Sequence, residues 1–140
     1  MPKDVVLARA IAAQLTAQEL DEIKNVKFDY NAYVDLDALP NEPVVFVTLD
    51  NSPWIRLSRG NVRRDAMIRV TMISEIGPTD AAQWVDDQLD SFDMLVDYLL
   101  ETPVNGQLPV DTESDDRYDV DRFHSNHRLV MDILFNYRNL

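Results

Sequence analysis

Apolar residues recur at helical spacing in two stretches of the chain. In residues 4–15 their spacing predicts a first helix that ends near Thr16, with Asp4 as its cap or as an acid in its first turn. A longer stripe predicts a second amphipathic helix over residues 80–100. This stripe consists of Ala81, Val85, Leu89, Phe92, Val96 and Leu99, widened by Trp84 and Leu95.

Elsewhere the apolar period is two, which is typical of strands. Alternating residues 26–30, the β-branched run 43–49, the longer alternation 64–76 and the closing alternation 129–137 each predict one strand. Short connections between sequential strands favour antiparallel pairing. We therefore predict an α+β fold of order α-β-β-β-α-β, in which two helices pack on one face of a four-stranded, mainly antiparallel sheet and leave the other face partly open.

Residues 1–140 are expected to form a single domain, because the length suits one core and no repeat or low-complexity linker interrupts it. Two connections, 50–63 and 103–126, are longer than usual, and each has room for a short strand. The chain has no cysteine, no run of 18 apolar residues and no signal-peptide pattern. We expect a soluble, unexported protein without disulfide or thiol chemistry.

The formal net charge is −12, from 25 acidic and 13 basic residues. A chain with this excess of acid is a poor general nucleic-acid binder, because phosphate contacts require a basic surface. Solubility alone would also explain a net charge of this size. The positions of the charges therefore carry more information than their sum.

The stretch "ESDDRYDVDRFHSNH", residues 113–127, has the composition of a metal or hydrolytic site. However, His124 and His127 lack the helical HExxH setting, and "DDRYDVDRF" lacks the glycine of a calcium loop. No phosphate-binding loop and no GxSxG elbow occurs. We expect a polar connection that Tyr118 and Phe123 hold against the sheet, and predict no catalytic residue, metal or cofactor.

The second predicted helix is acidic along its length and contains no lysine or arginine. Like charges four residues apart each cost a few tenths of a kcal/mol in an isolated helix. Three explanations remain open: a solvated face, a surface for a basic partner, and a face that repels a polyanion. The acidic residues that would line such a partner surface or a channel are Asp86, Asp87, Asp90, Asp93, Asp97 and Glu101.

Basic residues gather instead in the connection "DNSPWIRLSRGNVRR" and the strand that follows it. We expect Trp54 and Ile55 to be apolar anchors at the tip of this connection. The arginines either pair within the subunit or meet acidic residues of a neighbouring copy, as in a heterologous ring. The candidate interface residues are Trp54, Ile55, Arg56, Arg59, Arg63 and Arg64.

Taken in order, five segments cover almost the whole chain: "VVLARAIAAQL", "WIRLSRG" leading into "DAMIRVTMIS", "AAQWVDDQLDSFDMLVDYL", "DRYDVDRF" and "RLVMDILFNYR". Their pattern and order resemble the tail terminator or tail-completion proteins of tailed bacteriophages. The resemblance implies a non-enzymatic structural protein of the virion neck, made in the host cytoplasm.

The resemblance implies that this chain forms a homo-oligomeric, hexameric ring, which caps the tail tube and joins it to the connector or stopper protein on the head side. It also implies that DNA passes through a negatively charged channel in this ring without specific binding, and that no membrane is involved. The same pattern is compatible with other small neck or minor tail proteins. The alternative is a small monomeric binding or regulatory module that uses the open face of the sheet.

Overall fold

The computed structural model describes residues 2–18, 20, 23, 25–30, 43–51, 54–58, 61–75, 81–113 and 128–138. Within these residues the chain forms two helices and seven strands. They are α1 (Lys3–Gln18), β1 (Asn25–Asp29), β2 (Val44–Asn51), β3 (Trp54–Ser58), β4 (Asn61–Arg64), β5 (Ala66–Glu75), α2 (Ala81–Glu101), β6 (Asp111–Glu113) and β7 (Arg128–Tyr137). The α+β class and the predicted helices and strands are confirmed, and both long connections contain strands.

The main sheet has five strands in the order β1-β2-β5-β7-β6, one more than the four predicted, because β6 pairs with β7 at the edge. Three of its four pairings are antiparallel. The pairing of β1 with β2 is parallel, so for these two strands the antiparallel expectation was wrong. The reason is the length of residues 30–43, which exceeds the dozen residues that a parallel crossover requires.

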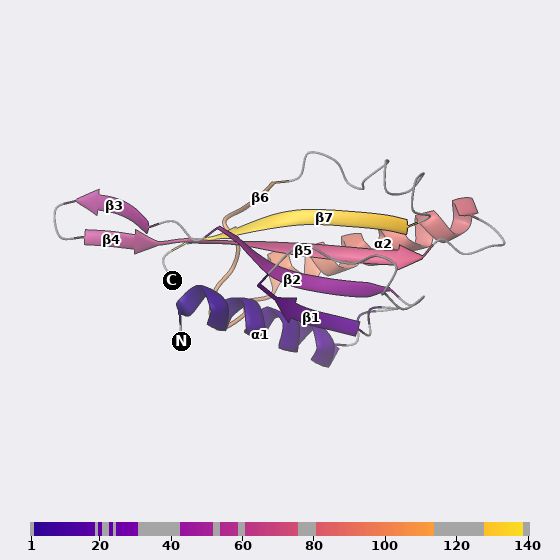
Figure 1. The fold of residues 1–140 in the computed structure, drawn as a ribbon, viewed down its shortest axis with the longest axis horizontal. Coiled ribbons are helices and arrows are strands. Elements are labelled where there is room, and N and C mark those ends of the chain that lie inside the picture. Colours follow the sequence, from indigo (N-terminus) through magenta and orange to yellow (C-terminus); the bar gives the residue numbers. More distant parts are fainter. Residues whose placement is uncertain are drawn as a thin grey trace.

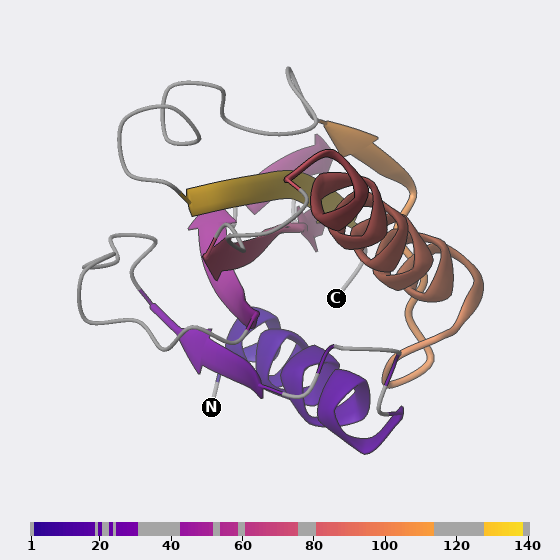
Figure 2. The ribbon, with the colours of Figure 1, turned by 90° about the vertical axis from the view of Figure 1, so that its right-hand side faces the viewer.

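Both helices lie on the same side of this sheet, as predicted (Figure 2). They bury one continuous core with the strands, in which Ile11 and Leu15 of α1 and Phe92 and Leu95 of α2 are inaccessible or nearly so. Phe92 is 3% exposed, as its place in the apolar stripe predicted.

The buried face of α2 is rotated slightly from the predicted stripe. Val85, Leu89 and Val96 are only half-buried, whereas two polar residues, Gln88 and Ser91, are buried. The hydroxyl of Ser74 in β5 donates a hydrogen bond of 2.9 Å to the Gln88 amide oxygen. A polar contact between sheet and helix therefore lies inside the core, where the sequence pattern indicated apolar packing alone.

The opposite face of the sheet is divided into two regions. Val44, Phe46 and Ile73 form a second buried apolar cluster on it, against which Val130 packs. The other region carries an ionic network centred on Arg69. The expectation of a partly open face thus applies only to the polar region.

Strands β3 and β4 form a separate two-stranded hairpin (Figure 1). We call residues 54–64 the arm. It leads out of β2 and returns directly into β5, and it projects beyond one end of the main sheet, whereas α2 begins at the other end (Figure 1). The long connection 50–63 is therefore an extension of the β2/β5 pair.

Candidate interaction surfaces: the arm and the acidic helix

The register of the arm decides which of the predicted interface residues lie at its root. Trp54 pairs with Arg64, and Ile55 pairs with Arg63, at the end that joins the main sheet. The expectation that these two apolar residues stand at the tip was therefore wrong. Ser58 pairs with Asn61 at the other end of the arm, so these two are the described residues nearest its tip. Arg56 pairs with Val62 between root and tip, and Arg59 lies outside the described residues.

An ion pair ties the root of the arm to the first helix. The Nη2 atom of Arg64 lies 3.1 Å from Oδ2 of Asp4, in the first turn of α1. The Asp4 side chain is 7% exposed and the Arg64 side chain 21%, so this pair is largely shielded from water. For Arg64 the structure thus shows pairing within the subunit, and its guanidinium is engaged in holding the arm to the body.

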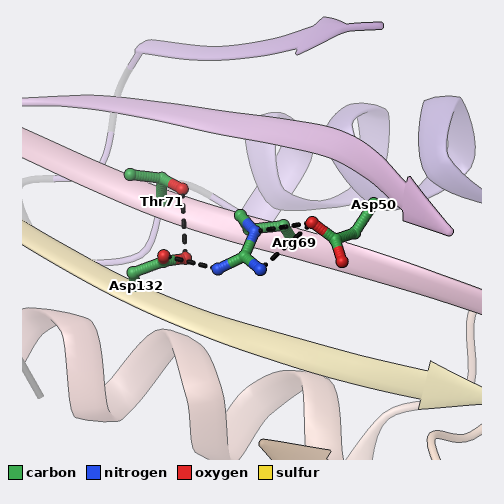
Figure 3. Close-up of polar contacts among 4 residues, drawn as sticks. All are labelled: Asp50, Arg69, Thr71 and Asp132. Carbon is green, nitrogen blue, oxygen red and sulfur yellow. Dashed lines mark hydrogen bonds and ion pairs between the residues drawn. The ribbon is translucent and has the colours of Figure 1, made fainter. Parts of the chain in front are cut away.

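A second network holds the other strand of the root (Figure 3). Arg69 of β5 lies 3.1 Å from Asp50, near the end of β2, and 2.6 Å from Asp132 of β7. Thr71 donates a hydrogen bond of 3.3 Å to the other oxygen of Asp132. Burial by itself lowers the pKa of Arg69, but Asp132 and then Asp50 outweigh it, so this pKa is raised. The guanidinium therefore stays charged and links three neighbouring strands.

Together these contacts fix the arm where it leaves the body. Asp50 precedes the arm and Arg64 ends it, and each has an ionic partner in a different element. A two-stranded ribbon alone is marginally stable in water, so anchoring at both strands of its root limits its possible directions. The arm is thus presented at a defined orientation to whatever lies beyond the sheet.

The acidic helix face predicted from the sequence is on the surface. Six carboxylate residues of α2 are exposed, and α2 contains no basic residue: Asp86, Asp87, Asp90, Asp93, Asp97 and Glu101. Gln83 donates a hydrogen bond of 2.9 Å to Asp87. Among these acids lies Met94, whose exposed fraction of 46% is high for a large apolar side chain.

Among the described residues, no group of side chains indicates catalysis or metal binding. The histidine-containing stretch, apart from Glu113, lies outside them. Among the residues the structure does place, no three histidine, aspartate or glutamate side chains gather as metal ligands. A pocket of about 200 Å³ lies between α1 and the turn after α2, where Lys3 is the only ionisable residue among Val6, Leu7, Asn105 and Gln107. It offers no acid and base pair.

Sequence reasoning missed the residues that orient the arm. Asp4 was considered only for the helix terminus, and Asp50 and Asp132 were not singled out. One signal was available: Asp4 lies four residues before Ala8, on the apolar side of the predicted helix, and a carboxylate on a buried helix face requires a partner. The identity of that partner, 60 positions away, has no sequence signature.

The chain was compared with protein-family models and with curated proteins, and neither comparison found a match. Among the described helices, none combines the length and apolarity that crossing a bilayer demands. The basic arm and the acidic face of α2 are therefore the two features of the described structure that bear on function.

Proposed function

We propose that this protein is a non-enzymatic structural subunit that assembles into a ring through its arm. In keeping with the phage-tail resemblance, the ring would cap a tail tube, join it to a head-side connector and leave a channel for DNA. The observation that carries this proposal is the arm itself. It is anchored at its root by ion pairs and projects past the sheet, with no strand of the five-stranded sheet paired to it.

The position of the arm supports a role in assembly over a role in folding. A hairpin that pairs only with itself adds little to the core of its own domain. From Trp54 to Arg64 its sequence holds four arginines and no acidic residue, and three of these arginines remain besides Arg64, which pairs with Asp4. Such a segment on a chain of net charge −12 finds its strongest electrostatic complement on another copy of the same protein.

The net charge also supports passage of DNA without binding. A duplex approaching a protein with this excess of carboxylates meets repulsion. Two of the arginines are also already paired with acids of the same subunit, Arg64 at the root of the arm with Asp4, and Arg69 on the body with Asp50 and Asp132. The arm alone could attract phosphate. Duplex binding that depends on the arm, with no change in oligomeric state, would therefore point to a DNA-binding protein instead.

The test is the solution mass of the purified protein over a range of concentrations, together with electron-microscope images. We expect a closed oligomer with a central hole, whose size gives the ring number. Reversal of two arm charges, Arg59→Glu with Arg63→Glu, should yield a folded monomer. A matched control is Lys27→Glu with Arg138→Glu, which changes the net charge equally outside the arm and should leave the ring intact. A wild-type protein that stays monomeric at every concentration would support the binding-module alternative.

A further inference from the structure

The exposed face of α2 carries more than solubilising charge. Asp90, Met94 and Asp97 follow one another at spacings of four and three residues, which places them side by side on one stripe of the helix. Met94 is 46% exposed within this acidic surrounding, and Leu100 is 40% exposed one to two turns further on. An apolar centre with a charged rim is the usual anatomy of a protein interface. Nothing in the described part of the chain covers this stripe.

The arm has the opposite composition in a similar arrangement. In the sequence Leu57 lies between Arg56 and Arg59, and Arg63 belongs to the second strand of the arm, β4. Leu57 is surrounded in sequence by cations and Met94 by anions. The two segments are therefore complementary in charge, and their apolar residues could be buried against each other. No acidic residue occurs between Trp54 and Arg64, and no basic residue occurs in α2.

In the described structure these two surfaces do not meet. The arm projects outward from one end of the sheet, whereas α2 lies along the sheet face and not beside the arm (Figure 1). The ion pairs at the root, Arg64 with Asp4 and Arg69 with Asp50, oppose a fold-back of the arm onto its own body. The α2 helix of the same molecule therefore does not supply the complement of the arm, whereas α2 of another molecule can do so.

We propose that the exposed face of α2, centred on Met94, is the docking surface for the arm of a second copy of this chain. This inference rests on the proposed ring and adds its contact: the arm of each subunit lies on α2 of the next, which is a head-to-tail contact that closes when the rotation fits. The acidic face is then buried between subunits and does not line the channel.

Docking also accounts for the run of like charges on α2. Carboxylates four residues apart, such as Asp93 with Asp97, repel each other in the free subunit. Arginines placed between them replace repulsion with attraction, so the acids that are unfavourable in the monomer stabilise the assembly. Because dissolved salt screens charges, the attraction between the arm and α2 should be strongest at low salt.

Cross-linking tests this contact directly, because the natural chain contains no cysteine. Ser58→Cys at the tip of the arm is combined with Met94→Cys on α2, and the purified protein is treated with a short bismaleimide. We expect covalent dimers and a ladder up to the ring size. The yield should exceed that of control pairs at least about tenfold, since docked cysteines react at their effective concentration and not by collision.

Two controls pair Ser58→Cys with other exposed positions. Ala82→Cys is on the same helix, about 18 Å from Met94 along its axis, and Thr112→Cys is on strand β6. Each single-cysteine variant alone should give little product. Rings that cross-link through Thr112 or through two Ser58→Cys arms, and not through Met94, would overturn the docking surface while the proposed ring survives. A protein that remains monomeric with no ladder in any variant would overturn both proposals.

Discussion

The two helices cover the same face of one sheet, yet their outer faces differ in charge. Helix α1 exposes two bases, Lys3 and Arg9, and its one acid, Asp4, is buried. Arg9 lies over the Phe28 ring, 4.7 Å from its centroid. Helix α2 exposes six carboxylates and has no base. Because α1 packs equally well without an acidic face, packing does not require one. The acidity of α2 is therefore available for a contact outside the subunit.

The inner faces of the helices are alike in a way that strengthens this comparison. Each contributes apolar residues to the same core, and each makes a polar contact with a strand, Asp4 with Arg64 for α1 and Gln88 with Ser74 for α2. Gln14 of α1 also donates a hydrogen bond of 2.8 Å to the Tyr98 hydroxyl of α2. The contrast between the helices is thus confined to the surface.

The largest expected effects come from the core, where the helices should behave alike. Phe92→Ala should cost about 3–5 kcal/mol of unfolding free energy and Ile11→Ala about 2–5 kcal/mol, because each leaves a cavity in a buried site. Urea titration measures both. A loss below about 1 kcal/mol for Phe92→Ala would show that the core-facing side of α2 is assigned wrongly, since cavities of this kind cost more.

The ionic root of the arm should give the next largest effect. Arg64→Ala removes the guanidinium from the nearly buried Asp4 carboxylate and should cost about 1–3 kcal/mol. Arg138→Ala is the control, because its contact with Asp111 is 4.0 Å long and exposed, so about 0.5 kcal/mol or less is expected. Equal losses in the two variants would remove the argument that the root is anchored.

Beneath the helices, Tyr137 predicts how stability changes at alkaline pH. Burial raises the pKa of this phenol, and its hydroxyl has no hydrogen-bond partner among the residues that the structure describes. The unfolded chain loses this proton first, so the stabilising contribution is present below the ordinary tyrosine pKa of about 10 and is lost as the pH rises above it.

Tyr137→Phe should therefore change stability near pH 7 by less than about 1 kcal/mol and should flatten its decline above about pH 10. Thermal melts of both proteins between neutral and alkaline pH measure this. A steeper alkaline decline in the variant would contradict the assignment.

The smallest effects lie on the outer faces and should have opposite signs. Asp93→Asn with Asp97→Asn should stabilise the isolated subunit by a few tenths of a kcal/mol at low salt, because it relieves repulsion within α2. Arg9→Gln on α1 should destabilise it by about 0.5–1 kcal/mol through loss of the contact with Phe28. Destabilisation by the aspartate changes would mean that the fold itself requires the acidic face.

Local patterns sufficed to predict both helices and the strands β1, β2, β5 and β7, because periods of 3.6 and two are read within a few residues. For β3, β4 and β6 the sequence indicated only that the long connections had room for short strands. The direction of β1 was missed, since parallel pairing depends on the length of the connection between β1 and β2 and not on the strand itself. Gln88 was missed because its burial depends on Ser74, which only the packed fold brings near it.

The candidate surfaces were predicted unevenly for the same reason. The acidic face of α2 follows from helical spacing, and the structure places all six of its acids at the surface. The orientation of the arm follows from contacts between distant residues, such as Arg64 with Asp4 and Arg69 with Asp132. Only a tertiary fold joins them.

The most direct test of the account is a charge swap between the arm and α2, followed by sedimentation velocity. Arg63→Glu alone and Asp97→Lys alone should each weaken assembly about tenfold, and the two together should recover most of the loss, because the attraction is restored in the opposite sense. Asp97→Lys should leave the subunit folded, since it places a cation near the C-terminal end of α2. Losses that simply add in the double variant would contradict docking of the arm on α2.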